Sequence, residues 1–142
     1  MNDHTHPTTL VLLDPTNADG EAALESLDAS DRHVALVVLL SGRTSAALRE
    51  FAAAEGISLA DAGFTYLDQV ALRAGMGSRL VETVLATGPD VAAELVLLAN
   101  ERNVSRIVLP PSSMRSDAAA VDRLSAALPG IEVSVAGLVG TR

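Results

Sequence analysis

Few side chains in this sequence are suited to chemistry, and those that are follow apolar runs. Asp14 comes directly after the run Leu10–Leu13, and three serines follow a later apolar run and two prolines: Ser112, Ser113 and Ser116. A carboxylate there could orient a ligand hydroxyl, and serines beside a helix N-terminus could hold a small anion. Asp14 equally suits an Asp-Pro-Thr turn, and the serines suit a rigid turn in which Asp117 caps the last helix. Both interpretations stay open.

The residue types needed for several kinds of catalysis are absent. The chain has no Cys, and its ten basic residues are all Arg, which excludes thiolate nucleophiles, Schiff-base lysines and the lysines of P-loops and phospho-receivers. His4 and His6 could catch a metal, but no third ligand accompanies them. His33 opens an apolar run, at the end opposite the expected ligand crevice. We therefore predict no catalytic residues, no metal site and no enzyme activity.

Charge and hydropathy restrict the partners of the chain. The formal net charge is −8 over 142 residues, which opposes binding to nucleic acid and to anionic lipid. The longest wholly apolar run, Val34–Leu40, is far shorter than the roughly 20 residues that span a bilayer. The first nine residues carry no basic and apolar leader pattern. We expect a cytoplasmic protein that contacts neither nucleic acid nor membrane.

Strand-like and helix-like segments alternate along the chain. Five runs are typical of strands: Leu10–Leu13, His33–Leu40, Leu80–Ala86, Arg106–Leu109 and Ile131–Leu138. Helical patterns separate them: Gly20–Leu27, Thr44–Ala54, Ala60–Ala74, a helix that begins at Asp90, and Ala118–Leu128. In the third of these helices we expect Phe64, Leu67 and either Val70 or Ala71 to face the core. The continuously apolar second strand is typical of a strand covered on both faces, as in a parallel sheet.

This alternation predicts an α/β fold: a doubly wound three-layer sandwich with a five-stranded parallel sheet. Residues 1–8 are expected to form a disordered tail, and residues 9–142 a single domain. In such folds ligands bind outside the carboxyl ends of the strands, where strand order reverses. These ends include Asp14, the residues after Leu40, the Gly88-Pro89-Asp90 segment and the residues from Pro110 onward.

Several of these segments resemble the universal stress protein family. The third strand, its glycine and the next helix start read V-E-T-V-L-A-T-G-P-D at 81–90, the fourth strand reads S-R-I-V-L at 105–109, and A-L-P-G-I-E-V-S-V follows at 127–135. L-V-L-L-D-P-T at 10–16 is similar to the first strand of the family. The resemblance implies the universal-stress-protein-like fold, which is also adenine nucleotide alpha hydrolase-like.

The resemblance also identifies a departure from the ATP motif of the family. ATP-binding members carry G-x-x-G, then about nine residues, then G-S or G-T after the fourth strand; here Pro110 and Ser113 stand at the first two glycines, and Ser116 and Asp117 at the last pair. Proline offers no amide hydrogen, and an aspartate repels phosphate. We therefore predict that ordinary ATP binding is lost and that no cofactor is required. The alternative is an ATP or AMP binder with a divergent site made by the three serines and Asp14, Leu39, Gly88 and Leu109.

Family members without the glycine motif act as adaptors or regulators, so the resemblance implies a non-catalytic stress-response or regulatory binding module with an unidentified protein partner. The family commonly dimerises through the fifth strand, where Ile131, Val133 and Val135 alternate with more polar residues. An uncovered terminal strand is a pairing surface, so these three residues are the predicted interface of a homodimer.

A flavodoxin-like electron carrier fits less well, because the few aromatic residues lie in helical segments. A phospho-receiver is excluded further by the lack of an Asp at the end of the third strand.

Overall fold

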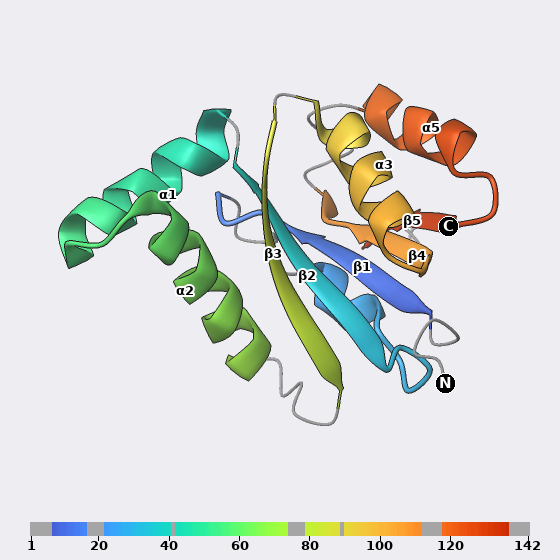
Figure 1. Cartoon of the computed structure of the whole chain (residues 1–142), viewed down its shortest axis with the longest axis horizontal. Coiled ribbons are helices and arrows are strands. Elements are labelled where there is room, and N and C mark those ends of the chain that lie inside the picture. The colour runs from blue at the N-terminus through green and yellow to red at the C-terminus, as the bar shows by residue number, and fades with distance from the viewer. Residues whose placement is uncertain are drawn as a thin grey trace.

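Five parallel strands form one sheet in the computed structural model, which describes residues 7–16, 22–40, 42–73, 79–88, 90–111 and 118–136. The strands are β1 (Thr8–Leu13), β2 (His33–Leu40), β3 (Leu80–Thr87), β4 (Val104–Leu109) and β5 (Glu132–Val135). Their order is β3-β2-β1-β4-β5 (Figure 1), and every neighbouring pair is parallel. The predicted doubly wound fold is confirmed.

Helices connect the strands at the positions that the sequence patterns predict. They are α1 (Gly42–Glu55), α2 (Leu59–Arg73), α3 (Val91–Glu101) and α5 (Ala118–Ala127), with a short 3-10 helix, η2 (Ala22–Ser26), between β1 and β2. Gly56 (φ +70°) ends α1, and the Asp90 carboxylate caps α3 by accepting a hydrogen bond from the Ala93 amide at 3.3 Å. Within the described part of the chain, no helix is long and apolar enough to cross a membrane.

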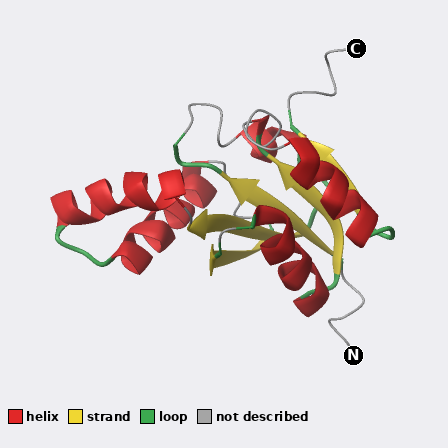
Figure 2. Cartoon of the chain, turned by 90° about the horizontal axis from the view of Figure 1, so that it is seen from above, coloured by secondary structure: helices red, strands yellow, loops and turns green. Residues whose placement is uncertain are grey.

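The core lies in two layers, one on each face of the sheet. α3 and α5 cover the first face, and their buried side chains pack on Leu10, Leu12, Val37, Leu39, Ile107 and Leu109. α1, α2 and η2 cover the second face, against Val11, Leu13, Val34, Leu36, Val38 and Val108. Figure 2 shows the α1 and α2 pair extending from one side of the sheet, away from the other helices. Because strand side chains alternate between faces, both faces of β1 and β2 must be apolar, which explains the unbroken apolar runs Leu10–Leu13 and Val34–Leu40.

The crossover from β1 to β2 differs from the other crossovers. Among the described residues it contains only the five-residue η2, whereas each of the others contains an α-helix. A segment this short cannot cover the second face as far as β5, and the side chains of β4 and β5 on that face include the polar residues Arg106, Glu132 and Ser134. A polar sheet surface beside η2 follows from the short crossover.

Two details of the sequence prediction are wrong. Phe64 is 39% exposed, because α2 turns Ala62, Gly63, Leu67 and Val70 toward the sheet. Gly63 lies so close to Leu85 that a Cβ there would come within 2.5 Å of Leu85 Cδ1. The fifth strand is also shorter than predicted: Ile131 precedes it, and Ala136 already lies in a turn.

An ion pair joins β3 to the end of α3. The Arg102 guanidinium donates two hydrogen bonds to the Glu82 carboxylate, from Nε to Oε1 at 3.0 Å and from Nη2 to Oε2 at 2.6 Å. Arg102 also lies 3.3 Å from a Glu101 carboxylate oxygen. The hydrogen bonds from Arg102 hold the pKa of Glu82 below its ordinary value of 4.5, and the pKa of Arg102 is raised in turn.

This ion pair predicts a small pH dependence of stability. Because the pKa of Glu82 is lower in the folded state, the pair stabilises the protein above pH 4.5 and loses this contribution as the pH falls through the folded-state pKa. Glu82 is largely exposed, so we expect Glu82→Gln to lower the free energy of unfolding by about 0.5 kcal/mol at pH 7 and by nothing at pH 2. Urea denaturation at the two pH values measures the difference. An equal loss of unfolding free energy at both pH values would show that the charge on Glu82 does not contribute to stability.

Candidate functional site

The strand order of the sheet reverses between β1 and β4, which are parallel neighbours. From β1 the chain crosses to β2 and β3 on one side, and it then returns to β4 and β5 on the other. The carboxyl ends of these two central strands carry Asp14 and Leu109. Leu39 lies near the same end of β2, and Gly88 directly follows β3. The fold therefore brings these four predicted site residues to one end of the sheet, the end at which doubly wound proteins bind ligands.

Asp14 is engaged in its own turn. Its Oδ1 accepts a hydrogen bond from the Thr16 amide at 2.9 Å and one from the Thr16 hydroxyl at 2.5 Å. These contacts make an Asx-type turn directly after β1. The carboxylate is half-buried, so the turn fixes its orientation at the end of the strand. The turn interpretation of the sequence is confirmed, and a ligand at Asp14 would share an acceptor that Thr16 already uses.

Leu39 and Leu109 have buried side chains. Both belong to the core layer between the sheet and the α3 and α5 helices. Pro110, which follows β4 directly, is also buried and has no N–H group to donate. Leu39 and Leu109 therefore support the end of the sheet from within.

A carboxylate covers Gly88. Gly88 has φ +155°, and a Cβ at this position would collide with the Glu94 side chain, whose Cδ would lie 2.6 Å away. Asp90, the N-cap of α3, lies 3.5 Å from the Arg123 guanidinium on α5, and both side chains are half exposed. Glu94 is in the first turn of α3, where its charge interacts favourably with the helix dipole. These carboxylates take the place that an incoming anion would need at this helix start.

The remaining predicted site residues cannot be placed. Ser112, Ser113, Ser116 and Asp117 lie outside the described residues, as do His4 and His6. Within the described ranges, no group of three or more His, Asp and Glu side chains could hold a metal ion.

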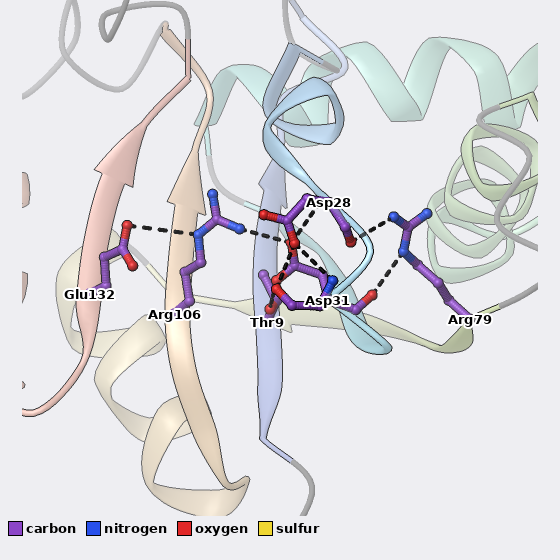
Figure 3. A network of polar contacts seen from close by, with 7 residues as sticks. Thr9, Asp28, Asp31, Arg79, Arg106 and Glu132 are labelled. Carbon is purple, nitrogen blue, oxygen red and sulfur yellow. Dashed lines mark hydrogen bonds and ion pairs between the residues drawn. The ribbon is translucent and has the colours of Figure 1, made fainter.

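A second polar cluster, which the sequence analysis missed, lies at the opposite end of the sheet (Figure 3). Asp31 precedes β2 and is only 6% exposed. Its Oδ1 accepts a hydrogen bond from the Thr9 hydroxyl at 2.5 Å, and its Oδ2 accepts one from the Asp28 amide at 2.8 Å and one from Arg106 Nη1 at 2.9 Å. Arg106 also lies 3.9 Å from Glu132. We call Thr9, Asp31 and Arg106 the amino-end cluster.

Arg79, which directly precedes β3, binds the backbone beside this cluster. Its Nε donates to the Asp31 carbonyl at 2.8 Å and its Nη2 to the Asp28 carbonyl at 3.0 Å. The Ser30 hydroxyl and amide bind the Asp28 carboxylate and lower its pKa. The signal for this cluster in the sequence is an arginine within the strand segment V-S-R-I-V-L at 104–109. The groups satisfy one another, which is typical of a structural clamp.

No protein-family model matches the sequence, and no curated protein matches it. Among solved structures, a universal stress protein in complex with cAMP aligns with a TM-score of 0.60 and 14% identity, over 92% of this chain and 96% of that chain. The chain has the universal stress protein fold.

Two further solved structures share this architecture. Hypothetical protein MJ0577 aligns with a TM-score of 0.62 and 14% identity, over 92% of this chain and 96% of that chain. Hypothetical protein PH0823 aligns with a TM-score of 0.57 and 20% identity, over 89% and 94%. At these identities the likeness concerns the fold, so function must be argued from the site.

Proposed function

We propose that this protein is a non-catalytic, cytoplasmic stress-response or regulatory binding module that acts as a homodimer and has lost ordinary ATP binding. The observation that carries the proposal is Pro110, which is buried at the end of β4 beside the strand-order reversal. ATP-binding universal stress proteins have a glycine there, whose amide can approach phosphate, whereas proline has no N–H group.

The charges at this end of the sheet support the same proposal. The Glu94 carboxylate lies against Gly88, and Asp90 occupies the cap of α3. Like charges raise the free energy of a bound triphosphate, and the Arg123 guanidinium near this helix start already pairs with Asp90. The net charge of −8 adds to this repulsion at longer range.

The geometry of β5 supports the homodimer. β5 is an edge strand whose described pairing is with β4 only. The Ala136 amide donates to the Leu109 carbonyl at 2.9 Å, and backbone groups alternate along a strand. The N–H and C=O groups of Val133 and Val135 therefore point away from β4. Their side chains pack into the core. A second copy would therefore contact this edge through the outward N–H and C=O groups of the backbone.

The alternative function is nucleotide binding at a divergent site. One structural neighbour is a universal stress protein in complex with cAMP. Asp14 lies at the carboxyl end of β1, next to β4 in the sheet, with its carboxylate oriented by Thr16. A smaller anion than ATP would meet less repulsion from Glu94 and Asp90.

Native mass spectrometry of the gently purified protein tests the proposal. We expect the mass of two chains with no adduct, and no heat when ATP with Mg²⁺, or cAMP, is titrated into the protein at saturating concentration. An adduct of about 300 to 500 Da per chain, or saturable heat, would establish the alternative. Asp14→Asn is the matched variant: it keeps an acceptor for Thr16 but removes the charge, so a nucleotide held by Asp14 would bind it more weakly.

A further inference from the structure

β3 forms the second edge of the sheet, and Glu82 is the one charged residue on this strand. All eight of its residues are in register with β2, from Leu80 opposite His33 to Thr87 opposite Leu40. Within the described part of the chain, β3 pairs with no other strand. Natural edge strands are usually short, bulged or interrupted by lysine or proline, and β3 has none of these features. Figure 1 shows β3 along its whole length, with α3 lying toward β4.

The backbone of β3 presents hydrogen-bonding groups at this edge. The Leu80 amide donates to the Arg32 carbonyl at 2.8 Å, so the even-numbered residues of β3 bond toward β2. The N–H and C=O groups of Val81, Thr83 and Leu85 therefore point away from the sheet. A strand added here would find three regularly spaced donor and acceptor pairs.

The two sides of this edge differ in chemistry. On the side of α3, the even-numbered residues of β3 and the neighbouring helix form a surface that we call the β3–α3 flank: Leu80, Glu82, Glu94, Leu97 and Glu101. Leu80 is 65% and Leu97 is 55% exposed. The flank carries three carboxylates and one guanidinium: Arg102 binds both Glu82 and Glu101, and Glu94 lies against Gly88 at the other end of β3. The flank is therefore acidic.

On the other side of β3 the surroundings are apolar. Val81 and Leu85 point toward α2 and pack against its core layer. α2 itself exposes two large apolar side chains, Phe64 at 39% and Leu72 at 82%, with the exposed Asp68 one helical turn from each. A strand lying along β3 would thus have acidic groups beside one set of its alternating side chains and apolar groups beside the other.

We propose that the β3 edge binds an extended segment of a partner protein in which basic residues alternate with apolar residues. The segment adds a sixth strand to the sheet, with its basic side chains beside the β3–α3 flank and its apolar side chains on the side of α2. The inference rests on the proposed function as a binding module, and it names the kind of partner. A second copy of the chain fits this edge poorly, because it would bring further carboxylates toward Glu94 and Glu101.

A labelled peptide tests the proposal. The probe is a synthetic peptide of about ten residues that alternates arginine with valine, and the control peptide has glutamate in place of arginine. We expect saturable fluorescence anisotropy with the arginine peptide only. Thr83→Pro removes an outward N–H while leaving the hydrogen bonds with β2, and it should weaken binding at least about tenfold. The matched variant Thr83→Ala keeps the N–H and should bind within about twofold of the wild type.

Hydrogen exchange on the wild-type protein locates the bound peptide without any variant. We expect the peptide to slow exchange at the amides of Val81, Thr83 and Leu85, whose N–H groups point outward in the free protein. Equal binding to Thr83→Pro and Thr83→Ala, or protection that maps elsewhere, would overturn the proposal, as would the absence of binding. Concentration-dependent dimers that Thr83→Pro abolishes would assign the edge to a second copy. Native mass spectrometry without peptide reports the β5 dimer separately, so either proposal can fail alone.

Discussion

Replacing Asp31 by alanine is expected to lower the free energy of unfolding by about 3 kcal/mol, although Asp31 lies far from the predicted ligand end of the sheet. The carboxylate is almost fully buried and accepts hydrogen bonds from Thr9, the Asp28 amide and Arg106. Its removal leaves these three donors without their acceptor and leaves the Arg106 charge, only 20% exposed, without its closest ion-pair partner. Urea denaturation at pH 7 measures the loss.

Variants of the neighbouring charges separate the contributions within this cluster. Asp31→Asn keeps an acceptor for Thr9 but removes the ion pair, so it should be less destabilising than Asp31→Ala. Glu132→Gln is the matched control, because Glu132 is 67% exposed and 3.9 Å from Arg106; we expect a change within about 0.5 kcal/mol. A double-mutant cycle with Arg106→Gln measures the coupling of Asp31 to Arg106. If Asp31→Ala costs no more than Glu132→Gln, the amino-end cluster is not a structural clamp.

The short crossover from β1 to β2 explains why this cluster exists. An α-helix at that place would cover β4 with apolar side chains, but η2 reaches β1 and β4 over only five residues. Beyond η2 the surface of β4 carries Arg106, whose charge needs both water and a partner. Asp31 supplies the partner at the entrance to β2, and its contacts with Thr9 and Arg106 link β1 and β4 to this entrance.

The strands could be predicted from the sequence because their signals are local. β2 is an unbroken apolar run, and its predicted bounds, His33–Leu40, are those observed. The rotation of α2 could not be predicted, since it depends on the close approach of Gly63 to Leu85, which lies 22 positions away in the chain. The expected inward position of Phe64 was wrong for this reason.

The position of the candidate site at the carboxyl ends of the strands could be predicted from the sequence. The contacts between its side chains could not. Parallel strands bring Asp14 and Gly88 to one end of the sheet whatever their side chains do. That Glu94 lies over Gly88 depends on how α3 crosses the sheet. Asp31 and Arg106 are 75 residues apart, and only the pairing of β1 with both β2 and β4 brings them together.

The proposed β5 dimer leads to the other large expected effect: Val133→Pro should convert the dimer to a monomer. Val133 is paired with Ile107 in register, but its own N–H points away from β4, toward the position of a second copy. Proline removes that donor and places its ring in the path of the pairing strand, while the Ala136 to Leu109 bond is unaffected. We expect dissociation to become at least about 100-fold more favourable, measured by sedimentation equilibrium and native mass spectrometry.

Two variants make this result specific for β5. Val133→Ala keeps the N–H but truncates the half-buried side chain that packs on the core, so it should lose some stability and remain dimeric. Thr83→Pro changes the opposite edge of the sheet and should also remain dimeric. A dimer that survives in Val133→Pro would contradict pairing through β5. If Thr83→Pro is monomeric instead, the two edges have exchanged roles: β3 joins the copies, and the short β5 edge is free for a partner.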